Sequence, residues 1–252
     1  MPFRPLVLCY HAVTERWQDP LAVPPSAFER QLRLLLRARL EPVDIDGVLA
    51  NRRRTFHVTF DDAYRSVAPV VPLLERLGVP VTIFACTDLA QRGDAMAVPE
   101  LDGRAGPHPE ELLTMRWEAL AELAGRGVEI GSHTASHPHL PALSDDELRR
   151  ELAGSRERVE ARLGRPCRFL SYPFGEEDAR VQAAAKAAGY VAAFTLRGDF
   201  GSPPPHALPR VDIYRADGPA RFALKASPVG PVALTGLRRL RRRSAGLAAR
   251  RA

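Results

Sequence analysis

Short runs of apolar and β-branched residues alternate along this chain with longer segments in which apolar residues recur every three or four positions. The short runs have the composition of buried strands, and the longer segments have the period of amphipathic helices. Such alternation is typical of βα units, whose strands lie parallel in one sheet. The predicted strands span residues 6–9, 56–60, 79–85, 128–131, 168–172, 190–195 and 207–211.

Two of the predicted helices begin with a capping-box sequence, in which a serine precedes a glutamate by three residues. Ser26 with Glu29 opens a helix that runs to residue 40, and Ser144 with Glu147 opens another that runs to residue 159. Further helices are predicted over residues 69–77, 116–126 and 178–188. The stretch 91–109 is rich in glycine, proline and charge without periodicity, which indicates a loop insertion.

The number of βα units favours a closed barrel. The chain has 252 residues, of which 45% are hydrophobic and 26% charged, and this composition excludes collagen-like, mucin-like and wholly disordered proteins. Single (β/α) barrels commonly reach about 250 residues. We therefore predict an α/β protein with one domain over residues 1–234, a (β/α) barrel of about seven strands, in preference to an open sheet.

The net charge of +6 is concentrated at the end of the chain. Residues 235–252 contain seven arginines and no acid, so residues 1–234 carry a net charge of −1. A nucleic-acid-binding domain usually has a basic face on its folded body, and we expect no nucleic-acid partner here. The segment 235–252 is predicted to be either a disordered arm or a basic amphipathic segment that makes peripheral contact with an anionic membrane.

The cysteines and the chain ends indicate a compartment. Cys9, Cys86 and Cys167 are far apart and form no Cys-x-x-Cys pair, which is typical of buried free thiols in a reducing environment. No signal-peptide core and no apolar stretch of the roughly 20 residues that span a membrane is visible. We expect a cytoplasmic protein, peripheral at the inner membrane face if the basic segment docks there.

Four polar clusters each follow a predicted strand directly. Because the carboxyl ends of parallel strands lie on one face of a barrel, we expect these clusters to converge. Each also has a structural interpretation, since an aspartate pair often caps a turn or helix and a lone histidine is often packed or exposed. The clusters are Tyr10-His11, Asp61-Asp62, residues 132–138 and residues 171–175. We retain the structural interpretation for His57, which is predicted to be packed, and for His108, His139 and His206.

His133 and His137 differ from the other histidines because their i, i+4 spacing lets two imidazoles face one point, in a helical turn or a tight loop. Two imidazoles leave a divalent metal under-coordinated, and either Asp61 or Asp62 can supply a carboxylate. Such a set keeps positions open for water and substrate, as in a catalytic zinc site. No glutamate lies between the histidines, so the general base would be the other aspartate. Zn²⁺ suits imidazole ligands, and Co²⁺, Ni²⁺, Mn²⁺ or Fe²⁺ can occupy similar sites.

Three motifs in this order resemble the polysaccharide deacetylases of carbohydrate esterase family 4, over roughly residues 5–215. They are Thr59-Phe60-Asp61-Asp62, His133-Thr134-Ala135-Ser136-His137-Pro138 and Tyr172-Pro173-Phe174-Gly175. The resemblance implies a distorted (β/α) barrel with one divalent metal that hydrolyses N-acetyl groups on an amino-sugar-containing glycan, giving acetate and a free amine. It implies Asp61 as the base, Asp62, His133 and His137 as metal ligands, and Tyr172, Pro173 and Phe174 as substrate-binding residues. The backbone N–H of Tyr172 would then assist the oxyanion.

Two features depart from the family pattern. The late Leu-x-His motif, which supplies the catalytic acid, is absent, and Leu8-Cys9-Tyr10-His11 resembles that motif moved to the front. The circularly permuted exopolysaccharide deacetylases share this order, which implies His11 as the acid. Ser171 stands where many members have an arginine that orients the catalytic aspartate. We predict that Arg210 supplies this cation to Asp61.

Two other functions fit the same residues. The same barrel and metal could hydrolyse a small linear or cyclic amide that is not a sugar. A catalytically inactive module that binds glycan or docks on a membrane is the alternative outside enzymes. The presence of both aspartates, both motif histidines and His11 favours the enzyme.

Overall fold

The computed structural model describes residues 5–196, 200, 202–227 and 230. The Arg-rich segment 235–252 and the predicted domain boundary at residue 234 lie outside these residues, so both stay predictions. Within the described ranges, no helix combines the length and the apolar character that crossing a bilayer requires.

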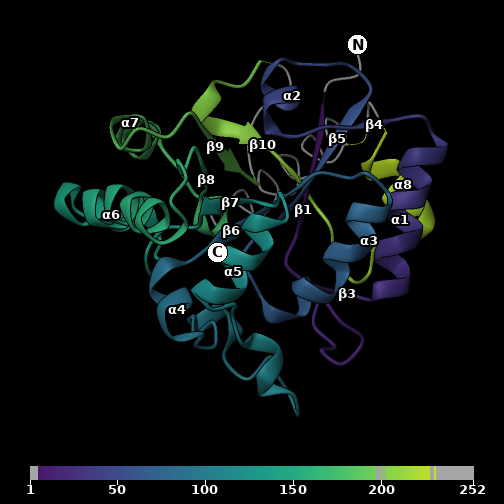
Figure 1. The fold of residues 1–252 in the computed structure, drawn as a ribbon, viewed down its shortest axis with the longest axis horizontal. Helices are drawn as coiled ribbons and strands as arrows, with labels where there is room; N and C mark the ends of the chain where they lie inside the picture. Colours follow the sequence, from purple (N-terminus) through teal and green to yellow (C-terminus); the bar gives the residue numbers. More distant parts are fainter. Residues whose placement is uncertain (1–4, 197–199, 201, 228–229, 231–252) are drawn as a thin grey trace, which may run out of the picture.

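A parallel sheet lies at the centre of the molecule (Figure 1). The strands are ordered β10-β9-β8-β7-β6-β5-β1-β11. The two edges of this order are halves of one segment, because β10 pairs with β9 whereas β11, two residues on, pairs with β1. The sheet therefore returns on itself as a barrel with seven strand positions, which confirms the predicted (β/α) barrel. The strands are β1 (Leu6–Tyr10), β5 (Thr55–Phe60), β6 (Val81–Ala85), β7 (Glu129–Ser132), β8 (Phe169–Ser171), β9 (Ala192–Thr195), β10 (Leu208–Pro209) and β11 (Val211–Asp212).

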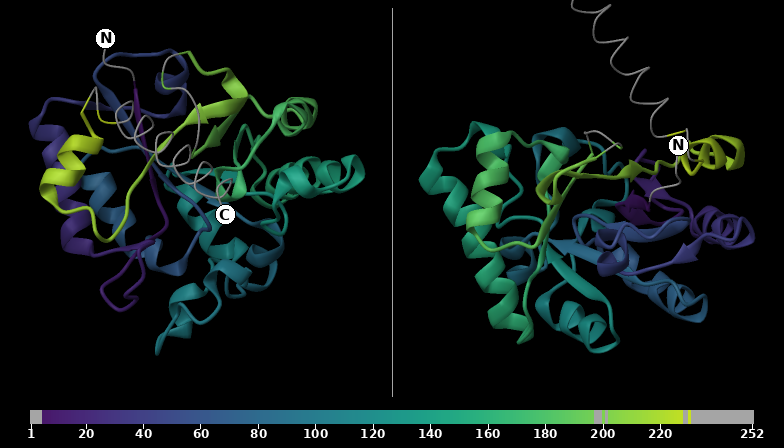
Figure 2. Two further views of the ribbon diagram at one scale, coloured as in Figure 1. Left: turned by 180° about the vertical axis from the view of Figure 1, so that it is seen from behind. Right: turned by 90° about the horizontal axis from the view of Figure 1, so that it is seen from above.

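Helices surround this barrel in both views of Figure 2. Their apolar faces bury Leu32, Leu120 and Leu152 against the outside of the strands. A second apolar cluster fills the barrel with Phe84, Phe169 and other strand residues. The helices are α1 (Pro25–Arg37), α2 (Ile45–Leu49), α3 (Val71–Arg76), α4 (Thr87–Arg92), α5 (Trp117–Gly125), α6 (Asp145–Leu163), α7 (Ala179–Ala187) and α8 (Pro219–Lys225).

Helix α2 closes the end of the barrel where the strands begin. The short strand β4 (Glu41–Pro42) pairs with the start of β5, and α2 then packs Ile45 and Val48 into the cluster inside the barrel. His57 lies beside this plug, fully buried, with Nδ1 2.7 Å from the Val43 carbonyl and Nε2 2.9 Å from the Thr82 hydroxyl. The prediction that His57 is packed is confirmed. Because α2 covers this end of the barrel, a functional site is expected at the opposite end, where the strands finish.

The starts of the predicted helices agree with the structure in part. The capping box at Ser144 is present with both of its hydrogen bonds. The one at Ser26 is wrong, because α1 begins one residue earlier at Pro25 and has no side-chain cap. Proline at a first helical position already fixes the backbone there, which leaves Ser26 inside the first turn. The helix predicted over residues 69–77 is divided into a 3-10 turn and α3, with Pro69 inside the 3-10 turn.

The insertion and the cysteines agree with the predictions, whereas several short elements were not predicted. The insertion at 91–109 is mostly irregular, as predicted, and contains a 3-10 turn at Pro99–Leu101. All three cysteines are free and buried. The sequence pattern missed α2, α4, α8, β4 and the two-residue strands β2 (Ala12–Val13) and β3 (Ala22–Val23), which are too short to show a period.

We predict that Gly131→Ala destabilises the barrel by about 1–3 kcal/mol through overpacking. A Cβ at Gly131 would lie 2.5 Å from a ring carbon of Phe84 and 2.9 Å from the Phe169 carbonyl oxygen. Urea unfolding measures the effect. The matched control is Gly154→Ala in α6, where a Cβ meets nothing within 4 Å and alanine should stabilise the helix by up to about 1 kcal/mol. Equal stability of Gly131→Ala and the parent would contradict this account of the packing.

Candidate functional site

The four polar clusters meet at the carboxyl end of the barrel. His11 follows β1, Asp61 and Asp62 follow β5, and His133 follows β7. Ser171 is the last residue of β8, residues 172–175 follow it, and Arg210 lies between β10 and β11. The parallel register places all of these strand ends at one edge, so Asp61 and Arg210, which are 149 positions apart, come into contact.

Asp62, His133 and His137 form a compact buried group, here called the triad. One ligand atom from each lies within 4.8 Å of the others. The Nε2 atoms of His133 and His137 lie 3.4 and 3.5 Å from the same oxygen, Oδ1 of Asp62. Each side chain is less than 9% exposed. The structure thus brings together the three residues predicted as metal ligands.

The triad fits a divalent metal ion. His133 Nδ1 lies 2.8 Å from the Ser171 carbonyl, which can only accept a hydrogen bond, so the lone pair is on Nε2. Burial lowers the pKa of His133 and of His137 to about 4, so both imidazoles are neutral at pH 7. Oδ1 of Asp62 is buried without a hydrogen-bond partner among the described residues, and this desolvation raises the pKa of Asp62. A metal cation would satisfy all three donors at once.

The backbone around the triad is in an uncommon conformation. His133 and His137 lie on a tight loop, not on a helix, and His137 has a φ of 66°. Thr134, at φ 69°, accepts a hydrogen bond of 3.1 Å from the His137 N–H through its hydroxyl. Among the described non-glycine residues, five of the eight with positive φ belong to this end of the barrel: Asp62, Ala63, Thr134, His137 and Phe174. Strained backbone gathered at one place is typical of a functional site.

Asp61 is held by a buried ion pair with Arg210. Nη1 and Nη2 of Arg210 donate to the two carboxylate oxygens at 2.7 and 2.6 Å, and both side chains are nearly inaccessible. The Ser171 hydroxyl joins them, since it accepts from Arg210 at 2.7 Å and donates to Asp61 at 3.1 Å. Burial alone would raise the pKa of Asp61, but the adjacent guanidinium outweighs it and holds that pKa well below its usual range. Asp61 is therefore ionised at neutral pH.

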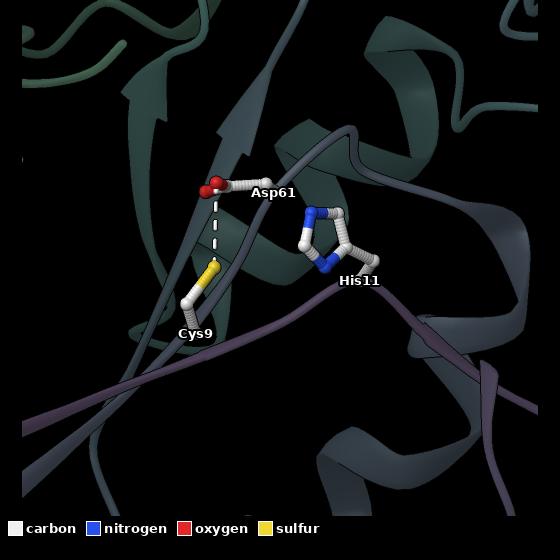
Figure 3. A group of neighbouring side chains, drawn as sticks. All are labelled: Cys9, His11 and Asp61. Atoms are coloured by element: carbon white, nitrogen blue, oxygen red, sulfur yellow. Dashed lines mark hydrogen bonds between the residues drawn. The ribbon is translucent and has the colours of Figure 1, made fainter. Parts of the chain in front are cut away.

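Cys9 and His11 approach Asp61 from β1 (Figure 3). The Cys9 thiol donates to Oδ2 of Asp61 at 3.4 Å, and burial raises the thiol pKa well above its ordinary value. One ligand atom each of Cys9, His11 and Asp61 lies within 4.8 Å of the others. Nδ1 of the half-buried His11 has no hydrogen-bond partner among the described residues. An imidazole with spare hydrogen-bonding capacity thus lies beside the aspartate.

Tyr172 does not have the role predicted for its backbone. Its N–H donates to the Phe194 carbonyl at 3.0 Å as part of the barrel, and its hydroxyl donates to the His206 carbonyl at 2.9 Å. The side chain is completely buried. The prediction that the Tyr172 N–H stabilises an oxyanion is therefore wrong, because the sheet already uses that donor. Pro173 begins the 3-10 turn Pro173–Gly175 that follows.

Phe174 forms a wall beside the triad. Its ring meets His137 edge to face, with centroids 4.6 Å apart, and stacks on His139 with centroids 4.1 Å apart. His139 is exposed, and its two ring nitrogens contact Glu176 and Glu100. The structural interpretation of His139 therefore needs one addition, because the imidazole supports an aromatic residue of the site.

Sequence reasoning missed part of the surroundings of Asp61. Thr59 receives a 3.0 Å hydrogen bond from Arg210, and Cys9 was interpreted only as a buried thiol. Strand alternation was a usable signal, since Thr59 and Asp61 are two positions apart and point to the same side of β5. No local pattern indicated that Cys9 would lie next to them.

Comparisons with known proteins agree with this geometry. A family model described as polysaccharide deacetylase matches residues 49–193. The protein YxkH of Bacillus subtilis (strain 168), a candidate polysaccharide deacetylase by name, is 25% identical over 192 residues. That match covers 73% of this chain and 61% of YxkH, so the chain spans less than two thirds of that relative.

Several solved structures share the fold. The Bacillus cereus polysaccharide deacetylase BC0361 has a TM-score of 0.73 at 24% identity, covering 90% of this chain and 70% of that one. The Streptococcus pyogenes deacetylase PplD, solved with acetate, has a TM-score of 0.74 at 21% identity, covering 90% and 100%. IcaB from Ammonifex degensii has a TM-score of 0.74 at 20% identity, covering 90% and 97%. At these identities the likeness concerns the barrel.

We predict that Arg210→Met destabilises the protein by about 3–5 kcal/mol, because Asp61 would be left as an unpaired buried charge. The double variant Asp61→Asn/Arg210→Met removes both charges and should recover most of that loss. Urea unfolding of the two variants and the parent measures the difference. An Arg210→Met protein as stable as the parent would show that the ion pair carries no such energy.

Proposed function

Because this chain belongs to the polysaccharide deacetylase family, we propose that it is a metal-dependent hydrolase that removes N-acetyl groups from a glycan or glycoconjugate containing an amino sugar. The products are acetate and a free amine. The observation that carries the proposal is the meeting, at one end of the barrel, of the triad with an ionised aspartate and with the His11 imidazole, whose Nδ1 has no hydrogen-bond partner among the described residues. Metal-dependent amide hydrolysis uses a metal site, a base and an acid together.

In this proposal Asp62, His133 and His137 hold one divalent metal. Two imidazoles and a carboxylate favour Zn²⁺, and Co²⁺, Ni²⁺, Mn²⁺ or Fe²⁺ suit a similar donor set. Bound there, the metal supplies Lewis acidity that activates water and polarises an amide carbonyl. Two features of the protein support this use of the triad, namely the neutral imidazoles and the Oδ1 atom of Asp62, which no described residue hydrogen-bonds.

Asp61 acts as the general base in this mechanism. It takes a proton from the attacking water, for which it must be ionised and aimed at the substrate side of the triad. Arg210 meets both requirements, since two parallel hydrogen bonds fix the carboxylate plane and the positive charge keeps it deprotonated. Ser171 leaves room for this arrangement and bonds to both partners. Arg210 is thus proposed as the orienting residue.

His11 acts as the general acid that protonates the leaving amine. An amine leaves poorly unless it is protonated, and imidazole suits proton donation near neutral pH. The position of β1 supports a permuted order of motifs. β1 pairs with β5 on one side and, on the other, with β11, the last strand of the described residues. A motif that follows β1 therefore lies in space beside the last strand, although it comes first in the sequence.

The substrate is proposed to meet Phe174, whose ring is partly exposed beside His137. Aromatic faces are suited to contact with the apolar side of a sugar ring. Tyr172 and Pro173 contribute by fixing the turn that presents Phe174. A cytoplasmic location and peripheral membrane contact through residues 235–252 remain predictions of the sequence.

Acetate release tests this proposal directly. The purified protein is incubated with a panel of N-acetylated amino sugars and oligosaccharides, beside small linear and cyclic amides. We expect acetate from the sugar panel, its loss after treatment with a chelator, and recovery when Zn²⁺ or Co²⁺ is returned. Turnover only of the small amides would favour the alternative amide hydrolase, and metal uptake with no turnover would favour a binding module.

Substitution of the proposed base, Asp61, and of a proposed metal ligand, His133, should have different effects. Asp61→Asn should retain the metal and lose turnover by roughly 10²–10⁴-fold, the range for removing a general base. His133→Ala should lose the metal itself, which elemental analysis detects. His108→Ala, a partly exposed histidine of the insertion, is the matched control and should bind metal as the parent does. Full turnover by Asp61→Asn, or full metal content in His133→Ala, would refute these roles.

A further inference from the structure

The loop that carries the triad histidines is fixed from both sides. From α4, the N–H groups of Thr87 and Asp88 donate to the carbonyls of Thr134 and Ala135 at 3.1 and 2.9 Å. These two bonds satisfy the carbonyls of Thr134 and Ala135. The loop donors, the N–H groups that point the other way, need a separate partner.

That partner is Glu151 of α6. Oε2 of Glu151 accepts from the N–H groups of Ala135 and Ser136, both at 2.9 Å, and Oε1 accepts from the Ser136 hydroxyl at 2.7 Å. Consecutive backbone N–H groups next to a left-handed residue, here Thr134, form a concavity that binds anions. One carboxylate thus occupies all of the available donors of the two central loop residues.

The position of Glu151 is itself well determined. The next residue, Leu152, is completely buried in the main apolar core. One turn further along α6, the Ser155 hydroxyl lies 2.8 Å from that of Ser132, which accepts from the Thr134 N–H at 3.0 Å. Because these neighbours on α6 are packed and hydrogen-bonded, the helix holds the Glu151 carboxylate in a fixed position beside the loop.

We propose that Glu151 is a positioning residue of the metal site. Its carboxylate holds the loop in the conformation in which His133 and His137 both face Asp62, although it does not itself lie in the triad. Without the anion, the N–H groups of Ala135 and Ser136 would turn to water, and the segment between the left-handed residues Thr134 and His137 would lose a restraint. Charge-assisted hydrogen bonds of this kind are stronger than neutral ones. This inference rests on the proposed metal-dependent function and deepens it.

The test is the affinity of the full chain for Zn²⁺, measured by competition with a chromogenic chelator. Glu151→Ala should weaken Zn²⁺ binding by roughly 10- to 100-fold, the usual effect of removing a group that orients metal ligands. Glu151→Gln should recover part of the loss, because its amide oxygen can accept from both N–H groups and its amide nitrogen can donate to the Ser136 hydroxyl. Glu157→Ala makes the same change at an exposed position of α6 and should match the parent.

A measurement of folding separates an effect on stability from an effect on the metal site. Urea unfolding of the metal-free proteins establishes that Glu151→Ala is folded. If it is not, Glu151→Asp, with a carboxylate one methylene too short to reach all three donors, takes its place under the same criterion. Zn²⁺ binding by the folded variant as tight as that of the parent overturns the role of Glu151 and leaves the proposed function standing. A parent protein that binds no Zn²⁺ overturns both.

Discussion

The closure of the barrel and the electrostatics of the site depend on one buried ion pair. Arg210 lies where the chain leaves β9 and begins to pair with β1, which is the point that closes the sheet. Its guanidinium lies near the rings of Phe84 and Phe194 and ends on the carboxylate of Asp61. Because an arginine remains charged when buried, this contact requires an aspartate opposite it, and the aspartate in turn needs the closed barrel to meet its partner.

This pairing gives two neighbouring aspartates opposite properties. Asp61 and Asp62 are both buried, but Arg210 compensates the charge of Asp61 and lowers its pKa. Burial raises the pKa of Asp62, and one of its oxygens stays without a hydrogen-bond partner in the described part of the chain. The charge of the first carboxylate is thus compensated within the protein, whereas the second is the one proposed to bind a cation. The proposed base and the proposed metal ligand are thereby distinguished by environment, although the residue type is the same.

Other side chains around the site also fix its groups through hydrogen bonds. Arg210 comes from the β10–β11 segment, and Ser171 at the end of β8 supplies a small hydroxyl between the charges. Glu151 performs the corresponding task for the histidine loop, where it satisfies backbone donors instead of a guanidinium. In both cases a charged side chain on a rigid element fixes a group that the proposed chemistry requires, which is how a strained site persists in a well-packed barrel.

Local sequence patterns were enough to predict the barrel and the gathering of Asp61, Asp62, His133 and His137, because strand periodicity is local and parallel strands place every polar terminus at the same end. It also indicated Arg210 as the partner of Asp61, although from a family pattern and not from contact. Which hydrogen-bond donors are already in use follows from the three-dimensional contacts alone. The Tyr172 N–H is taken by Phe194, Cys9 lies against Asp61, and Glu151 holds the histidine loop. Such pairings join distant residues through strand register and helix packing, which no local pattern of hydrophobic and polar positions specifies.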